Sequence, residues 1–218
     1  MRMTERLRGL KAWTQTNLCD GREMKAPAEG HDIGVINTQV PKCYLAWAPA
    51  KVDDMGNPVG TMESTVPSVL LLPNQAYAKY VEEGRFDRRL NVHRPQEMGQ
   101  QLAISFLFSV YEPGIRLPGF VQSMGEQGRD MDMSLLLEGT EEGLMTLMGW
   151  MDDCVEKLLG DKIIPNTDLY VMESTVTYSL YTDQKYVVDR RPIYYGFVNC
   201  VFGSYATEAY NAELNALL

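Results

Sequence analysis

The sequence predicts an α+β protein in which a mixed or antiparallel sheet is flanked by two main helices. The clearest strand is QLAISFLFSVY at 101–111, where bulky apolar residues occupy every second position. The clearest helix is 140–159, where leucines and methionines recur at helical spacing. The chain has 218 residues, of which 45% are hydrophobic and 22% charged. This length can bury a core and lies within the range of one domain, so we expect a single domain over 1–218.

The first helix is expected at 4–18, with Thr4 as its cap and Leu7, Leu10 and Leu18 near one stripe. Because its amphipathic pattern is moderate, we expect it to lean on the sheet. The charged N-terminal segment lacks the apolar core of a signal peptide or a membrane span. We therefore expect a protein that is made and kept in a cytoplasm.

Extended connections at 19–66 follow, because glycines and prolines punctuate this region. Within it, 42–48 has the pattern of a short strand that ends before Pro49. The apolar run at 68–73 predicts a strand buried on both faces, and 75–84 reads as a short helical or strand-like piece. The strand at 101–111 is expected to face the core with its even-numbered residues, which are Leu102, Ile104, Phe106, Phe108 and Val110.

Residues 112–138 are rich in glycine and proline and have little periodicity, which predicts a long loop or an arm that orders against a neighbour. In the helix at 140–159, Thr140 is the expected cap and Gly160 the expected stop. Its apolar stripe should comprise Leu144, Leu147, Met148, Met151, Val155, Leu158 and Leu159. Its charged residues off the stripe should form a solvated face; they are Asp152, Asp153, Glu156 and Lys157.

Two strands should close the fold, at 174–182 and 192–202, with a turn at 182–185 and a short tail helix at 206–218. The strand at 192–202 is apolar on both sides, so we expect both to be covered, in part by another subunit. We expect Tyr195, Phe197 and Val201 to hold it on the core. The opposite side would carry Tyr194, Val198, Cys200 and Phe202.

The charge balance disfavours tight binding to duplex DNA. The chain has 29 acidic and 20 basic side chains, a net charge of −9, whereas affinity for nucleic acids rests mainly on cations that neutralise phosphates. The cysteines lack the spacing of a zinc or redox motif and are expected to be buried free thiols in a reducing compartment. They are Cys19, Cys43, Cys154 and Cys200. The two histidines, His31 and His93, are too few for a zinc site without help from other ligands.

No catalytic signature is present, so we expect no catalytic residue, no cofactor and no resident metal. Asp130 and Asp132 have the chemistry to approach a cation, but the oxygen rhythm of a calcium loop is absent. The DRRP stretch is open to two interpretations, the edge of an active site or an ion-pairing assembly face, and we favour the second. A third interpretation, stacking of single-stranded nucleic acid on Tyr194 and Tyr195, conflicts with the net negative charge of the chain. The candidate subunit-interface residues are Arg116, Asp130, Asp132, Asp183, Lys185, Asp189, Arg190 and Arg191.

Three segments carry a resemblance to a known family. They are FLFSVYEPGIRLPGF (106–120), EGTEEGLMTLMGWMDDCVEKLLG (138–160) and YSLYTDQKYVVDRRPIYYGFVN (178–199). They resemble proteins encoded in the tail-morphogenesis regions of phages and prophages of Gram-positive bacteria. The order helix, strands, helix, strands also resembles phage tail terminator proteins. The resemblance covers most of 1–205, and the length beyond that of many tail terminators falls in 19–66 and 112–138.

The resemblance implies a structural virion protein without an active site. Such a subunit forms a six-fold ring that caps the tail tube, and the sheath where one exists, and offers a surface to the head connector. Genomic DNA would pass through the lumen without specific binding, and a lining of carboxylates would suit that passage. The protein would be assembled in the host cytoplasm and reside in the tail or neck of the virion.

Three alternatives remain open on the sequence. A head-side connector or neck adaptor would contact portal proteins rather than tube ends. A small nucleic-acid or peptide binding module would be a monomer or dimer with salt-sensitive binding. An enzyme with an unrecognised site would show a pocket with a strongly shifted carboxylate or histidine.

Overall fold

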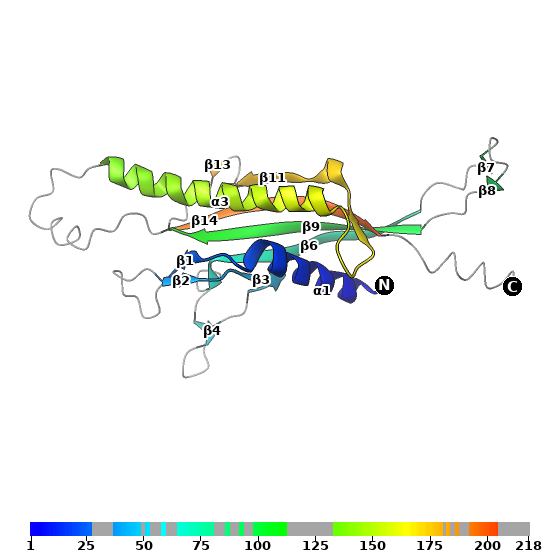
Figure 1. Cartoon of the computed structure of the whole chain (residues 1–218), viewed down its shortest axis with the longest axis horizontal. Helices are drawn as coiled ribbons and strands as arrows, with labels where there is room; N and C mark the ends of the chain where they lie inside the picture. The colour runs from blue at the N-terminus through cyan, green and yellow to red at the C-terminus, as the bar shows by residue number, and fades with distance from the viewer. Residues whose placement is uncertain are drawn as a thin grey trace, which may run out of the picture.

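Two helices lie on one face of a six-stranded mixed sheet in the computed structural model, which confirms the predicted α+β class (Figure 1). The structure describes side chains for 1–27, 37–48, 65–74, 101–112, 141–180 and 192–204. It describes the backbone alone for 51–52, 58–59, 75–80, 86–87, 92–93, 98–100, 133–140, 182–183 and 186–187. The tail helix expected at 206–218 lies outside the described residues.

The main sheet has the strand order β10–β14–β9–β6–β3, and β11 pairs with β14 beside β10. The long strands β6, β9 and β14 are antiparallel to one another, whereas β3 runs parallel to β6. The strands of the main sheet are β3 (Lys42–Leu45), β6 (Ser68–Tyr80), β9 (Met98–Tyr111), β10 (Leu169–Val171), β11 (Thr177–Leu180) and β14 (Ile193–Ser204). The apolar run predicted to end at residue 73 thus continues as strand to Tyr80, through a bulge between Pro73 and Gln75.

Among the described residues, four small antiparallel pairs lie outside the main sheet. They are β1 (Met24–Ala26) with β2 (Asn37–Gln39), β4 (Lys51–Val52) with β5 (Pro58–Val59), β7 (Phe86–Asp87) with β8 (Val92–His93), and β12 (Thr182–Asp183) with β13 (Tyr186–Val187). The sequence did not predict these pairs, nor strand β10. Segments of two or three residues contain too few residues for a periodic pattern to be visible.

The α-helices in the described part of the chain are α1 (Met3–Thr14) and α3 (Met133–Asp161). The first continues as a π-helix, η1 (Gln15–Cys19), so the predicted end near residue 18 is confirmed. Its N-cap is Arg2 rather than Thr4, and the Glu5 carboxylate accepts the Arg2 backbone N–H at 2.8 Å.

The second helix is longer than predicted at both ends, so Thr140 does not cap it and Gly160 does not stop it. It takes in residues 133–138, which the sequence assigned to the loop. The leucines within 133–138 are strong helix formers. The glycine that follows them, Gly139, costs the helix only about 1 kcal/mol. A short 3₁₀ turn, η3 (Glu173–Thr175), precedes β11.

The core lies between the sheet and the helices, which contact the same sheet face (Figure 1). Strand β9 contributes its even-numbered residues, as predicted. The prediction for β14 was wrong, because its even-numbered residues face the core while Tyr195, Phe197 and Val201 lie on the opposite face, half-buried. Because odd- and even-numbered residues of β14 are both apolar, its sequence does not determine which side faces the core. The pairing of Val198 with Phe106 and of Cys200 with Ile104 determines it.

The sheet face away from the helices contains polar groups that bond across strands. The Ser68 and Ser109 hydroxyls lie 2.9 Å apart, joining β6 to β9. Ser105 on β9 accepts a hydrogen bond from Asn74 of β6 and donates one to Asn199 of β14. These bonds link the three long strands through side chains as well as through the backbone ladder.

Candidate assembly surfaces

None of the eight predicted interface side chains lies in the part of the chain whose side chains the structure describes. The backbone of Asp183 belongs to β12, where it pairs with Tyr186 of β13. Outside the described part of the chain lie the side chain of Asp183 and seven complete residues, which are Arg116, Asp130, Asp132, Lys185, Asp189, Arg190 and Arg191. The assembly role predicted for these residues stays a prediction.

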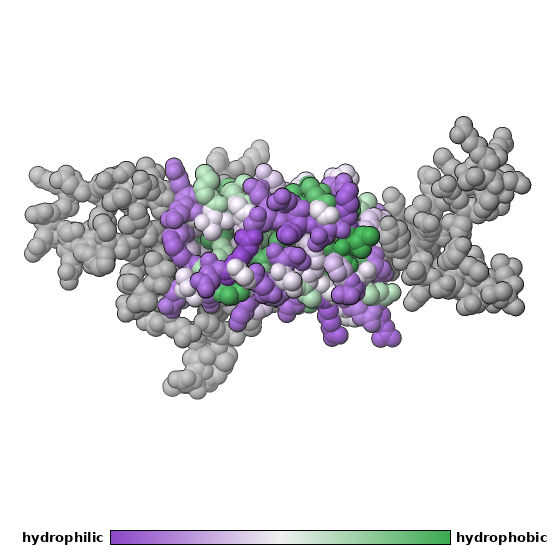
Figure 2. All heavy atoms as spheres, in the orientation of Figure 1, coloured by the Kyte–Doolittle hydropathy of each residue, from purple (hydrophilic) through white to green (hydrophobic). Residues whose placement is uncertain are grey.

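Two cations lie three residues apart on α1, and we define Arg8 and Lys11 as its basic surface. Arg8 is exposed and Lys11 is half-buried, whereas Lys42 of β3 pairs with Ser68 and lies on the sheet face away from the helices. Burial raises the pKa of the Cys43 thiol on β3 to about 12, and the positive charge of Lys11 opposes this rise. Figure 2 shows that the helix-bearing side of the molecule is mostly hydrophilic. A group of cations is a distinct local feature in a chain with a net charge of −9.

A tight turn at the end of β3 presents Trp47 to solvent, with 84% of its surface exposed. The Ala46 N–H donates to the Leu71 carbonyl at 2.9 Å, and the Trp47 N–H donates back to the Leu45 carbonyl at 2.7 Å. Ala46 is held at a φ of 61°, a left-handed conformation that costs a residue with a Cβ about 1 kcal/mol. The chain therefore holds a large aromatic side chain in water by means of a strained turn.

The outer edge of β3 is partly closed by Gln15, the first residue of the π-helix. Its side-chain oxygen accepts the Cys43 backbone N–H at 2.8 Å, and its amide nitrogen donates to Asp20 at 2.7 Å and to the Pro41 carbonyl at 3.3 Å. A strand edge whose N–H is already bonded cannot donate that bond to a further strand. A partner at this position would therefore meet side chains rather than extend the ladder.

An acidic surface follows the outward side of α3, and we define it as Glu141, Met145, Gly149, Asp152 and Glu156. These residues recur three or four positions apart, so they share one helix face, and all are exposed. Met145 is 66% exposed. The buried side of the helix is rotated slightly from the predicted stripe; it comprises Leu147, Trp150, Met151, Cys154 and Leu158, whereas Leu159 is 38% exposed.

Gly149 lies at the centre of the acidic surface, and nothing lies within 4 Å of the position that a Cβ would occupy there. The contrast is Gly143 on the same helix, where a Cβ would collide with the ring of Tyr194. Packing within the chain therefore explains the glycine at 143 and not the one at 149. A mid-helix glycine costs about 1 kcal/mol relative to alanine and leaves the backbone open to close approach.

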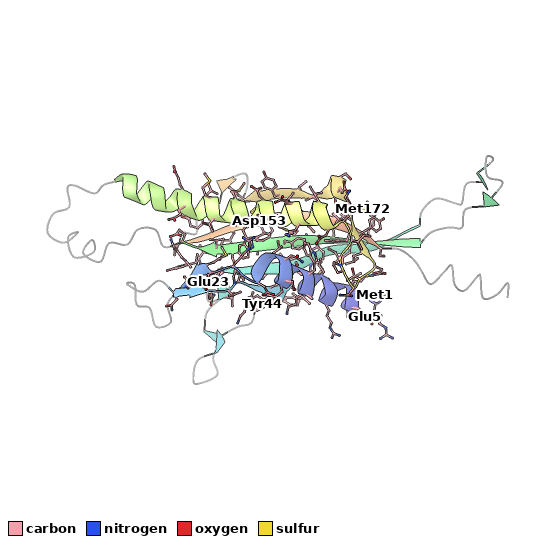
Figure 3. All side chains as sticks on the ribbon, in the orientation of Figure 1. Met1, Glu5, Glu23, Tyr44, Asp153 and Met172 are labelled. Atoms are coloured by element: carbon pink, nitrogen blue, oxygen red, sulfur yellow. The ribbon has the colours of Figure 1, made fainter. Side chains whose placement is uncertain are left out.

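Three contacts join the α1 region to α3. The Trp13 indole N–H donates to Asp161 at 2.7 Å, and the Trp150 indole N–H donates to the Leu18 carbonyl at 2.7 Å. Arg22 pairs with Asp153 at 2.5 Å, and Figure 3 shows Asp153 on α3. The basic and acidic surfaces are therefore parts of one packed unit.

Two further ion pairs hold the ends of the elements. Arg6 makes a two-pronged contact with Asp168, with Nε 2.8 Å from Oδ1 and Nη2 2.6 Å from Oδ2. The hydrogen bond from Arg6 holds the pKa of Asp168 below its usual range. Lys25 pairs with Glu112, a carboxylate that is 5% exposed, at 2.6 Å. Both pairs link segments far apart in the sequence.

The four cysteines are free and buried, as predicted. Burial raises the pKa of Cys19, Cys43 and Cys200 to about 12, and raises that of Cys154 well above its usual value. A thiol with such a pKa stays protonated at neutral pH and is a poor nucleophile. Among the described residues, no three His, Cys, Asp or Glu side chains are grouped to hold a metal ion.

Comparison with known protein families and with curated proteins finds no match to this chain. In the described part of the chain, no helix is long and apolar enough to cross a membrane. Sequence reasoning missed Trp47 and Gly149, although a tryptophan two residues before a proline and an isolated mid-helix glycine are both visible signals.

Proposed function

We propose that this protein is a structural ring subunit at the end of a phage tail, of the tail terminator type. The observation that carries the proposal is that the helical layer bears a basic surface on α1, formed by Arg8 and Lys11, and an acidic surface on α3. Two different, complementary surfaces on one chain favour head-to-tail contacts, and such contacts close into rings when the rotation permits.

The position of the family-like segments in the fold supports the same proposal. The described parts of the three segments belong to β9, α3, β11 and β14 and to the small pair β12–β13. Strand β14 pairs with β9 from Ile193–Tyr111 to Ser204–Gln100, and α3 packs on both strands. Most of the described residues that carry the resemblance thus belong to one packing unit of α3, β9 and β14, which is where a shared fold would place them.

The proposed role is assembly rather than catalysis. The ring would cap the tail tube, and the sheath where one exists, and would present a surface to the head connector. The net charge of −9 suits a lumen through which DNA passes, since carboxylates repel phosphates. The protein would be assembled in the host cytoplasm and remain in the virion.

The first test is the mass of the purified protein by light scattering, with negative-stain images of the same sample. We expect rings of six subunits. Purified tail tubes should then bind the protein at one end, whereas portal complexes should not. Binding to portal complexes and not to tubes would contradict the terminator role and favour a head-side adaptor. Salt-sensitive binding of nucleic acid or a peptide by a monomer would contradict both.

A further inference from the structure

We propose that two copies of this chain pair through β11, antiparallel and in one continuous sheet, around a two-fold axis at Ser179. The occupant of the β11 edge is thus the β11 strand of a second copy. A two-fold pair uses the same patch on both copies, whereas a ring uses two different patches on each copy. The contact therefore goes beyond the proposed ring and does not depend on it.

The hydrogen bonds of β14 show which of its residues bond to which neighbouring strand. On the β9 side, the Pro192 carbonyl accepts the Glu112 N–H at 2.9 Å. On the side of β10 and β11, the Val201 carbonyl accepts the Met172 N–H at 3.0 Å. The register of β14 with β9 is continuous over 193–204. Even-numbered residues of β14 therefore bond to β9, and odd-numbered residues bond to β10 and β11.

The residues of β11 whose backbone groups point away from the sheet are Tyr178 and Leu180. Thr177 and Ser179 stand opposite odd-numbered residues of β14, so their backbone groups bond to that strand. Bonding sides alternate along a strand, so the N–H and C=O groups of the other two residues face outward. Among the described residues, none bonds to this outer side of β11.

The chain closes neighbouring edges of the same sheet with its own groups. At β10, the Val171 N–H donates to the Lys162 carbonyl at 2.7 Å, and the Leu169 carbonyl accepts the Ile164 N–H at 2.9 Å. At β3, the Gln15 side chain has this role. The β11 segment also lacks the proline and charged side chains that protect open edges. Such an edge fits a further strand, because an extended backbone offers the matching N–H and C=O groups.

The outward residues of β11 match those of an identical strand. With Ser179 opposite its own copy, Tyr178 stands opposite Leu180 of the partner subunit, and the reciprocal pair forms as well. Both are hydrogen-bonded pairs, in which the two residues exchange both backbone bonds. The Tyr178 side chain is 50% exposed and would gain a cross-strand contact with that leucine. This register uses both outward residues of both copies.

The pair leaves room for the helices and for their charge. Helix α3 packs on β14 and β9, so roughly four strand spacings of about 4.8 Å separate the two copies of α3 in the joined sheet. This separation of roughly 19 Å exceeds the distance of about 8–10 Å between packed helices and the Debye length of about 8 Å at physiological salt. The acidic surfaces on α3 therefore oppose the pairing only weakly.

The substitution Ser179→Cys tests the register directly. In a non-hydrogen-bonded antiparallel pair the Cα atoms lie about 4.5 Å apart, within the range that a disulfide spans. Thr177→Cys is the matched control, because it is exposed on the same strand and face, yet its two copies would lie roughly 13 Å apart or more. With copper–phenanthroline, we expect Ser179→Cys to form covalent dimers at least about 10-fold faster than Thr177→Cys on non-reducing gels.

Trapping by a disulfide suits a contact of four residues, which we expect to be weak and reversible. The wild type, whose four cysteines are buried, is the blank. Equal rates for the two variants, or no cross-linking of either, would overturn the contact. Pairing of β11 with another strand, such as the part of β6 that extends past β3, would give that overturning result.

Substitution of Tyr178 separates backbone pairing from side-chain contact. Tyr178→Pro removes an outward N–H from each copy and keeps the ladder to β14, whereas Tyr178→Ala keeps the N–H. In sedimentation velocity, we expect the proline variant to associate about 10-fold more weakly than the alanine variant, because two backbone hydrogen bonds are lost. Equal association of the two variants would overturn strand pairing. The cysteine test does not require that the proline variant folds.

The outcomes separate this inference from the proposed function. Rings of six that show no cross-linking in Ser179→Cys would overturn the β11 contact and leave the ring proposal standing. Cross-linked dimers of a chain that forms neither rings nor complexes with tube ends would support the contact and contradict the proposed function.

Discussion

The contact between Arg6 and Asp168 joins α1 to the segment before β10, and its removal should measurably destabilise the fold. Arg6 is 5% exposed, and both of its bonds to the carboxylate are at ordinary hydrogen-bond distances, 2.8 and 2.6 Å. The perturbation we choose is Asp168→Ala, which leaves the guanidinium buried without this partner.

The size of the effect follows from the burial of the pair. Breaking a buried ion pair by removing one partner costs about 3–5 kcal/mol, because the remaining charge stays buried without the opposite charge that compensated its loss of water. The Asp168 side chain is 18% exposed, so water reaches part of the site and the lower figure applies. We expect a loss of about 3 kcal/mol for Asp168→Ala. Asp168→Asn retains an acceptor for one bond and should cost about 1–2 kcal/mol.

The assay is urea unfolding at pH 7 followed by circular dichroism, at a protein concentration low enough to avoid self-association. Arg6→Ala and the double variant complete a cycle, and we expect a coupling energy above about 1 kcal/mol. Lys157→Ala, an exposed cation on α3, is the control and should change stability by less than about 0.5 kcal/mol. A loss below about 1 kcal/mol for Asp168→Ala, or additive single variants, would refute the reasoning.

Three further predictions follow from the same packing. Because the pKa of Asp168 is lowered in the folded state, its ion pair stabilises the fold at pH values above the unfolded-state pKa near 3.8. This stabilisation is lost as the pH falls through the folded-state pKa, so the pH dependence of urea midpoints below pH 5 should flatten in Asp168→Asn. All four thiols should resist a thiol reagent at pH 8 and react together in urea, and a thiol that reacts in the folded protein would contradict their burial. Gly196→Val should cost about 2 kcal/mol, because even its Cβ would collide with the Met151 sulfur where α3 crosses β14; thermal melts should show this loss, and an unchanged midpoint would disprove the close approach.

The sequence determined the elements that have a long and one-sided pattern. Alternation in 101–111 predicted both the strand β9 and the face that it turns to the core. Leucine spacing predicted most of α3, and the lack of metal or redox spacing agreed with free, buried cysteines. These features depend on local periodicity and composition, which the order of residues records directly.

Only the tertiary structure decided the features that depend on pairing between distant segments. Strand β14 is apolar at both parities, so its core face was set by register with β9 and not by its own residues. The contact between Arg6 and Asp168 joins residues 162 positions apart, and no local pattern records such a pair. The exposure of Trp47 follows from the turn at Ala46, which no periodic pattern in the sequence records. Periodicity predicts which residues a strand or helix would bury, whereas the partner that buries them, and the surface left over, are fixed by the packing of the whole chain.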